Sequence, residues 1–163
     1  MIVLINGMQR SGSTFCFNVA REILEKTGSV FSIATDNYVE AVKKSNKSDH
    51  ILIKTHTPDE ALSKLVNQDK IKCICSFRNP SNAIESWMST FNFSFEDSIQ
   101  YFSDWQTRFN KIKTKTLLIP FMFIDSFPLL ATLLINKKLT GHYNPYYAIQ
   151  IAKKYDKKTY SRS

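Results

Sequence analysis

The sequence predicts an α/β fold of the P-loop type, with three layers in which helices flank a mostly parallel central sheet of about five strands. Two observations support this class. Short apolar runs alternate with longer amphipathic stretches, as in parallel α/β sheets. The first apolar run leads into a loop that holds Gly7 and Gly12, two of only four glycines in the chain. A chain of 163 residues, 43% hydrophobic, is sized for one core, and we expect one domain over residues 1–163.

The individual elements follow from apolar runs, helical spacing and end signals. Apolar runs predict strands at 2–6, 30–34, 51–53, 71–77 and 116–123. Helical spacing and capping signals predict helices between the glycine loop and Gly28, at 37–44, after His56, at 80–89, from Ser94 to about 112, at 128–138 and at 146–155. The polar, basic stretch at about 156–163 is expected to be a solvated tail.

Helix-start signals place two polar residues at the ends of strands. Thr57-Pro-Asp-Glu60 reads as a capping box with proline at the first helical position, so a helix begins directly after His56. Asn79-Pro80 likewise indicates that a helix begins directly after Arg78. Ligands of parallel sheets bind at the carboxyl ends of the strands. We therefore expect the 7–14 loop, His56 and Arg78 to converge on one edge.

The charge and the cysteines limit the classes of partner and compartment. The formal net charge is +8, which favours polyanionic partners such as a multiply phosphorylated nucleotide or nucleic acid, although a solvated basic surface has the same composition. Cys16, Cys73 and Cys75 match no metal-ligand spacing and no even disulfide framework. Buried thiols in a reducing compartment follow, and we expect a cytoplasmic protein.

Only residues 117–136 resemble a membrane span. That stretch holds Asp125 near its centre together with Pro120 and Pro128, and a buried acid is costly in lipid. A strand followed by a helix explains the stretch better, so we expect no membrane span.

The loop Gly7-Met-Gln-Arg-Ser-Gly-Ser-Thr14 has the G-x4-G spacing of a phosphate-binding loop between a strand and a helix. Backbone N–H groups and the helix N-terminus can face an anion there, with hydroxyl donors from Ser13 and Thr14 and a charged donor from Arg10. The Walker lysine is replaced by Ser13, and no apolar strand ends in an obvious Walker B aspartate. We therefore expect phosphate handling by cations and amides, without metal.

Four motifs in order resemble those of sulfotransferases that use 3′-phosphoadenylyl sulfate (PAPS). Arg10-Ser-Gly-Ser-Thr-Phe15 resembles their 5′-phosphosulfate loop, and Lys54-Thr-His-Thr-Pro58 resembles the Lys-Thr-His-x-Pro segment of the cytosolic members. Arg78-Asn-Pro80, followed by Ser86, resembles the 3′-phosphate motif, and Phe123-Ile-Asp125 is a degraded likeness of the Tyr-Glu-Asp strand end. The ordered set, spanning residues 7 to about 128, is more specific than any one motif.

The resemblance implies a role for each matching residue. Arg10, Ser11, Gly12, Ser13 and Thr14 would hold the 5′-phosphosulfate, and Arg78 and Ser86 the 3′-phosphate. Phe15 and Phe123 would contribute rings to the nucleotide site, although either ring could belong to the core. His56 would be the general base, with Lys54 and Arg10 stabilising charge on the leaving oxygen.

The implied function is metal-free, in-line transfer of a sulfuryl group from PAPS to a hydroxyl or amine acceptor, with adenosine 3′,5′-bisphosphate (PAP) as product. Family members are commonly longer, and their C-terminal Arg-Lys-Gly loop has no match here, although Lys157, Lys158 and Arg162 could replace its charge. A minimal enzyme, a homodimer that completes the acceptor site and a fold that binds without turnover all remain open. So do a P-loop kinase of a small metabolite and a nucleotide- or polyanion-binding module; no basic-aromatic ladder indicates a specific nucleic acid.

Overall fold

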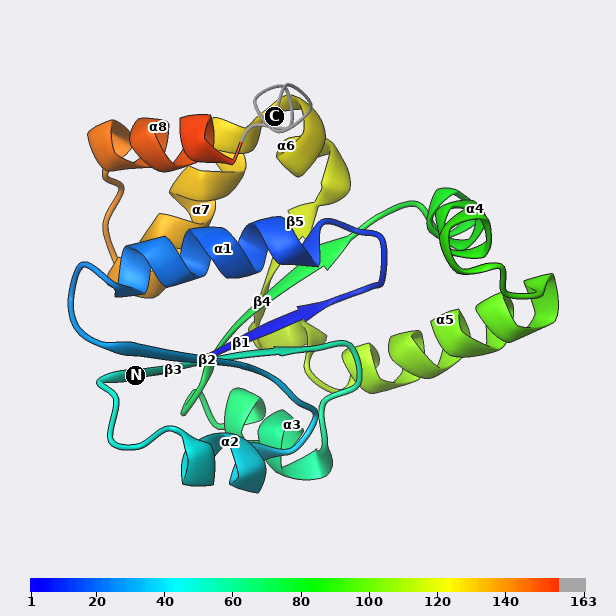
Figure 1. Cartoon of the computed structure of the whole chain (residues 1–163), viewed down its shortest axis with the longest axis horizontal. Coiled ribbons are helices and arrows are strands. Elements are labelled where there is room, and N and C mark those ends of the chain that lie inside the picture. Colours follow the sequence, from blue (N-terminus) through cyan, green and yellow to red (C-terminus); the bar gives the residue numbers. More distant parts are fainter. Residues whose placement is uncertain (156–163) are drawn as a thin grey trace.

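A five-stranded parallel sheet forms the centre of the protein (Figure 1). The computed structural model describes residues 1–155; the predicted basic tail, with Lys157, Lys158 and Arg162, lies outside the described residues. The strands are β1 (Ile2–Gly7), β2 (Val30–Ala34), β3 (His50–Thr55), β4 (Lys72–Phe77) and β5 (Thr116–Pro120). Their order is β2-β3-β1-β4-β5, and every neighbouring pair is parallel. The predicted parallel α/β sheet is confirmed.

Helices cover both faces of the sheet. They are α1 (Ser13–Leu24), α2 (Tyr38–Lys44), α3 (Glu60–Asn67), α4 (Pro80–Phe91), α5 (Phe95–Asn110), α6 (Phe121–Ser126), α7 (Pro128–Thr140) and α8 (Pro145–Lys154), with a short 3₁₀ turn at Lys113–Lys115. In Figure 1, α1, α7 and α8 lie on one side of the sheet and α2 and α3 on the other, while α4 and α5 extend beyond its edge. The three predicted layers are therefore present.

The central strand β1 is buried on both faces. Val3 and Ile5 pack into the core beneath α1, α7 and α8, whereas Leu4, which points the opposite way, packs into the core beneath α2 and α3. All three side chains are fully buried. This explains why the strand reads as a continuous apolar run instead of an alternating one.

Three predicted boundaries differ from the structure. The helix α1 ends at Leu24, not at Gly28, because Glu25 and Thr27 already close its last turn with backbone hydrogen bonds. Asp59, not Thr57, caps α3, since its carboxylate accepts from the Leu62 amide at 2.7 Å. The predicted strand 116–123 stops at Pro120, and the chain turns at once into α6, so Phe123 is helical.

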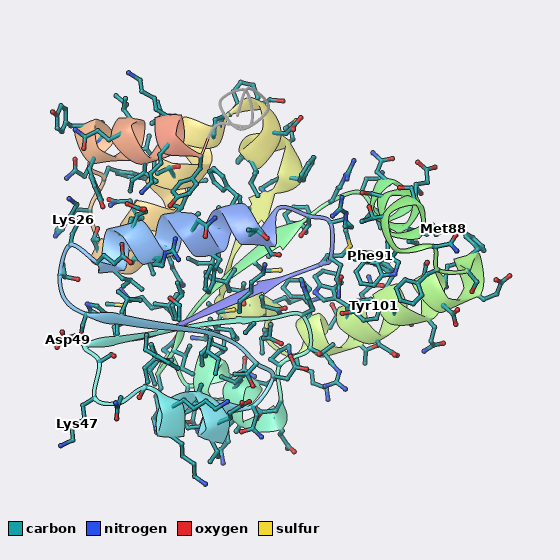
Figure 2. The ribbon with its side chains drawn as sticks, in the orientation of Figure 1. Lys26, Lys47, Asp49, Met88, Phe91 and Tyr101 are labelled. Atoms are coloured by element: carbon teal, nitrogen blue, oxygen red, sulfur yellow. The ribbon has the colours of Figure 1, made fainter. Side chains whose placement is uncertain are left out.

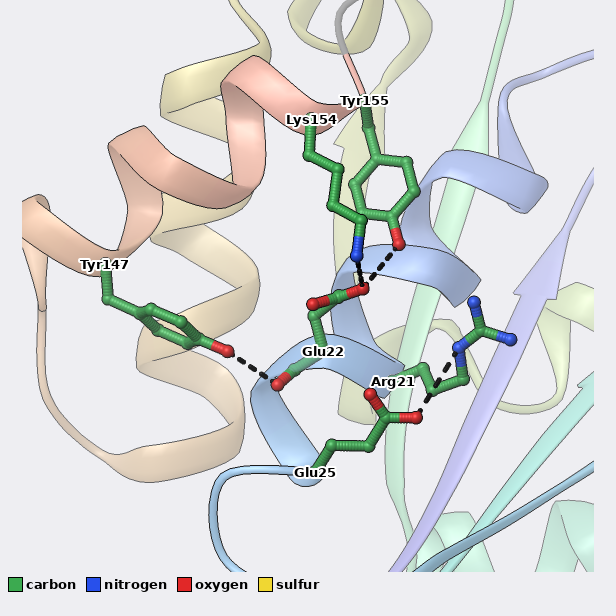
Figure 3. Close-up of polar contacts among 6 residues, drawn as sticks. All are labelled: Arg21, Glu22, Glu25, Tyr147, Lys154 and Tyr155. Carbon is green, nitrogen blue, oxygen red and sulfur yellow. Dashed lines mark hydrogen bonds and ion pairs between the residues drawn. The ribbon is translucent and has the colours of Figure 1, made fainter.

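A polar cluster fastens α8 onto α1 (Figure 3). The carboxylate of Glu22 accepts hydrogen bonds from Lys154 and from the Tyr155 hydroxyl, the latter at 2.8 Å. The Tyr147 hydroxyl donates to the Glu22 backbone carbonyl at 2.6 Å. Burial opposes ionisation of Glu22, but the hydrogen bonds from Lys154 and Tyr155, with the charges of Lys154 and Arg21, outweigh it and lower the pKa of the carboxyl below its ordinary value. Two residues of α8 and its C-cap residue, Tyr155, thus contact one residue of α1.

The thiols and the helices give two further facts about the described part of the chain. Cys16, Cys73 and Cys75 are buried and unpaired, and burial raises the pKa of the Cys16 thiol to about 12. Within residues 1–155, the longest and most apolar helices still fall short of what a membrane span requires.

Candidate functional site

The loop between β1 and α1 depends on two glycines. A Cβ at Gly7 would lie 2.5 Å from Ser76 Oγ and 2.9 Å from Ser13 Cβ, so the loop can cross the end of β4 only with glycine there. Gly12 has φ of +88°, which side-chain-bearing residues rarely adopt, and it forms the N-cap of α1. The loop therefore turns tightly enough to open the helix N-terminus toward a ligand.

Ser11 anchors this loop from below. Its hydroxyl lies 2.9 Å from the Ser76 carbonyl and 2.8 Å from the Ser76 hydroxyl, and it also contacts the Met8 carbonyl. The side chain is fully buried. We predicted Ser11 as a ligand-binding residue, but these contacts direct its hydroxyl into the protein. Its part in the loop is structural.

A cavity of about 450 Å³ opens above the loop. It is lined by Arg10, Gly12, Ser13, Thr14, Arg78, Ser86, Phe121 and Asp125. The first six of these were predicted from the sequence as ligand-binding residues, and the fold brings them together from β1–α1, β4–α4 and α4. The order of the strands explains this convergence, since β1 and β4 are neighbours and end at the same edge.

Two arginines lie side by side in this cavity. Arg10 Nε donates to Ser86 Oγ at 3.0 Å, and an Arg78 guanidinium nitrogen lies 3.4 Å from the Arg10 carbonyl. The Arg78 guanidinium also stacks on the Phe121 ring, 4.5 Å from its centroid. Arg78 is therefore on the same side of the sheet edge as the loop, as predicted. The cavity is therefore lined by two cationic side chains and by one carboxylate, that of Asp125.

His56 and Lys54 lie on the other flank of the same loop, at the end of β3. Lys54 Nζ donates to Thr14 Oγ1 at 2.9 Å. His56 Nδ1 contacts the Gly7 carbonyl. A carbonyl oxygen can only accept, so Nδ1 carries the hydrogen and the Nε2 lone pair of the neutral ring stays available. The loop is thus bordered by a base and an ammonium on one side and by two guanidinium groups on the other.

Burial sets the protonation of this flank. It lowers the pKa of His56 below its ordinary value, and the charge of Lys54 acts in the same direction, while the Gly7 hydrogen bond and Asp36 partly oppose the shift. Burial also lowers the pKa of Lys54, with Cys16 opposing the shift. At neutral pH the imidazole is therefore mostly in its basic form, the state that can take a proton.

Two predicted aromatic residues do not line the cavity. Phe15 and Phe123 are partly buried and pack against the core beneath α1 and α7. The aromatic ring of the cavity belongs instead to Phe121, which sequence reasoning missed because it treated 116–123 as one strand. Pro120, the last residue of β5, was the available signal for an earlier end. Asp125, quoted in the motif but given no role, lines the cavity from α6.

An aromatic cluster on α4 and α5 borders the loop and was not predicted. Trp87 stacks on Phe93 and Tyr101, with ring centroids 5.5 Å and 5.0 Å away, and tilts against Phe91. In Figure 2 the labelled Phe91 and Tyr101 lie between the two helices that extend from the sheet. The Tyr101 hydroxyl accepts from Gln9 of the loop, which ties this cluster to the site.

No cluster that could coordinate a metal emerges from the described 1–155 segment, where a group of three or more His, Cys, Asp or Glu side chains was sought. Apart from Asp125, the charged and hydroxyl side chains that line the cavity are donors, which suit phosphate and sulfate oxygens.

The comparisons with known proteins identify the family. The sulfotransferase domain family matches residues 2–127, which is most of the chain. The chain belongs to the sulfotransferase family. Among solved structures, the crystal structure of mouse sulfotransferase SULT7A1 complexed with PAP superposes with a TM-score of 0.67 and 15% sequence identity. The match covers 95% of this chain and 64% of the mouse chain. No curated protein sequence matches the present chain.

The match fits the geometry of this sulfotransferase-family chain. At 15% identity the likeness to the mouse protein establishes the fold alone. The family match spans the loop after β1, the end of β3, α4 and α6, which are the segments that carry the candidate site. The match spans 64% of the length of the mouse chain.

Proposed function

We propose that this chain binds PAPS and transfers its sulfuryl group to a hydroxyl or amine acceptor, releasing PAP. The observation that carries the proposal is the cavity in which Arg10, Arg78 and Ser86 meet the N-terminus of α1. Family membership supports sulfuryl transfer, and the mouse sulfotransferase of the same fold was crystallised with PAP.

The two ends of the donor would occupy two parts of the site. Backbone amides of the loop, with Ser13 and Thr14, would bind the 5′-phosphosulfate, because the helix dipole and the hydroxyl donors both favour an anion there. Arg78 and Ser86 would bind the 3′-phosphate. Arg10 belongs to the loop and also contacts Ser86, so its guanidinium could bind the 5′-phosphosulfate or the 3′-phosphate. Phe121, in place of the predicted Phe15 and Phe123, would offer a ring to the nucleotide.

The transfer step needs a base and a stabiliser for the leaving group. His56 Nε2 would take the proton of the acceptor hydroxyl or amine as that atom bonds to sulfur. The bond between sulfur and the bridging oxygen breaks, and its electron pair stays on the 5′-phosphate of PAP. Lys54 and Arg10 would stabilise that growing charge. The roles of these residues need no metal ion.

Calorimetry separates this proposal from its rivals. The chain is titrated with PAP, with 5′-AMP, and with ATP plus magnesium, each at two salt concentrations and with and without a chelator. Tight binding of PAP, weaker binding of 5′-AMP and no effect of the chelator support the proposal. Preference for ATP with magnesium would instead indicate a kinase. Steeply salt-dependent binding with no preference for a 3′-phosphate would indicate a polyanion-binding module.

Turnover is tested with PAPS and a panel of hydroxyl and amine acceptors, by following PAP release. Because the chain is shorter than the mouse sulfotransferase, size-exclusion chromatography with light scattering should accompany the assay. PAP binding without release of PAP from any acceptor, in a monomer or a dimer, would reduce the proposal to a binding protein.

A further inference from the structure

One carboxylate brackets the candidate base from both sides. Asp36 lies in the connection between β2 and α2, twenty residues before His56 in sequence. One of its carboxylate oxygens accepts from the Thr55 hydroxyl, and the other accepts from the Thr57 hydroxyl at 2.8 Å. These two threonines are the immediate neighbours of His56. Asp36 therefore holds the backbone on either side of the imidazole while leaving the ring itself untouched.

Backbone hydrogen bonds reinforce the same connection. The Asp59 amide donates to the Asp36 carbonyl at 3.0 Å, and the Thr35 amide donates to the Lys54 carbonyl at 3.1 Å. The Asp59 carboxylate, in turn, accepts from the Tyr38 amide at 3.0 Å. The loops after β2 and β3 are thus cross-linked in both directions. A segment held this way can keep His56 Nδ1 on the Gly7 carbonyl.

We propose that Asp36 is a positioning residue for His56, which it holds in the orientation and tautomer that leave Nε2 free to receive the acceptor proton. This inference rests on the proposed function. The sequence offered no sign of it, because Asp36 belongs to none of the four motifs and the hydroxyls it binds look like ordinary residues of a turn.

The charges around His56 predict a measurable consequence. Lys54 from β3 disfavours the imidazolium, Asp36 from the loop after β2 favours it, and the Gly7 carbonyl from β1 also favours it. Burial is the largest influence, and it lowers the pKa. Tyr101 from α5 lies within the field of the same carboxylate. Removing the charge of Asp36 should therefore lower the pKa of His56 further.

The test compares Asp36→Asn and Asp36→Ala with Asp69→Asn as the control. Asparagine at 36 can keep a hydrogen bond to each threonine without the charge, whereas alanine loses both. Asp69 is exposed and paired with Lys115, so Asp69→Asn removes a negative charge away from the site. The His56 titration is followed by NMR of the imidazole protons, assigned with His56→Gln, and the pH profile of kcat is measured on the same proteins.

We expect Asp36→Asn to shift the His56 titration and the acidic limb of kcat to lower pH together. Asp36→Ala should lower kcat by about 10- to 100-fold, since misplacing a catalytic group by about 1 Å has that effect, with KM for PAPS within about twofold. In the Asp69→Asn variant, the titration of His56 should match that in the unmodified chain. The proposal is overturned if Asp36→Asn titrates like the unmodified chain and Asp36→Ala keeps its kcat.

The two proposals fail in different ways. If the unmodified chain releases no PAP from any acceptor, the proposed function fails, yet the NMR titration still reports whether Asp36 controls His56. If transfer occurs but neither Asp36 variant changes the titration or kcat, only the positioning role is lost. Circular dichroism spectra and melting temperatures confirm that both variants are folded at the temperature of the assay.

Discussion

Lys54 and Thr14, forty residues apart, meet at the mouth of the candidate site, where the ammonium nitrogen lies 2.9 Å from the threonine hydroxyl. The contact joins the end of β3 to the first turn of α1. It holds a positive charge beside the loop, where a ligand oxygen can replace the threonine as partner. Burial lowers the pKa of Lys54 because it disfavours the ammonium form, and a nearby anion would stabilise that form.

Replacing Lys54 by methionine tests this charge. We expect Lys54→Met to lower kcat by about 10²- to 10³-fold, the usual effect of losing one donor that acts on the developing charge. The affinity for PAPS should change much less, because the charge on the bridging oxygen grows mainly in the transition state, whereas PAP carries that charge in full and should bind more weakly. Lys64→Met, on α3, is the control. A loss of PAPS affinity as large as the loss of kcat would assign Lys54 to ground-state binding instead.

The role of His56 is tested by separating binding from turnover. We expect His56→Ala to reduce sulfuryl transfer by about 10²- to 10⁴-fold, the usual range for a general base, while PAP binding by calorimetry stays within about twofold. His142→Ala, in the turn after α7, should leave both unchanged. Because burial lowers the pKa of His56, the rate should fall only as the pH drops below 6.5, its ordinary value. Full activity of the alanine variant would remove His56 from the mechanism.

Arg78 predicts selectivity for the 3′-phosphate. We expect Arg78→Ala to weaken PAP binding by about 10- to 100-fold, the value of one or two charge-assisted hydrogen bonds, and to leave 5′-AMP binding nearly unchanged. Arg108→Ala removes an arginine of α5 that lines a different groove and serves as the control. Equal losses for PAP and 5′-AMP would show that Arg78 does not bind the 3′-phosphate.

Two glycines with nearly equal, positive φ angles form a matched pair. Gly12 has φ of +88° and Gly141 of +86°, but a Cβ at Gly12 would lie 2.7 Å from Ile124 Cδ1, whereas nothing lies within 4 Å of one at Gly141. Both alanine variants should lose about 1–2 kcal/mol of unfolding free energy in urea titrations, because both force a left-handed residue. Gly12→Ala should lose more, and it alone should weaken PAP binding. Identical losses would mean that the loop accommodates the extra methyl group.

The attachment of α8 depends on ionised Glu22. Its pKa is lower in the folded chain than the ordinary value of 4.5, so the unfolded state binds its proton first as the pH falls. Stability from this group is therefore present above about pH 4.5 and is lost as the pH falls through the folded pKa. Glu22→Gln should flatten the fall of urea midpoint with pH in that range. Glu25→Gln, which removes the carboxylate of the exposed pair with Arg21, is the control.

The local signals of the sequence predicted the sheet and most of the site. The apolar run and the glycine spacing after it predicted the loop that follows β1. The helix-start signal Asn79-Pro80 predicted that Arg78 lies at the end of a strand. Both signals come from neighbouring residues, so they need no tertiary information. The motif likeness extended this to Ser86. These residues do meet in one cavity because parallel strands place their carboxyl ends on one edge.

The sequence by itself determined which segments form the five strands and most of the helices, and it determined the glycine loop, since each of these arises from residues close together in the chain. Only the tertiary structure decided which aromatic ring faces the cavity and which hydroxyls turn inward. It also placed Asp36 across both neighbours of His56. These outcomes depend on contacts between segments about 20 to 110 residues apart. Hydrophobic periodicity and motif spacing describe neighbouring residues only, so they do not predict such contacts.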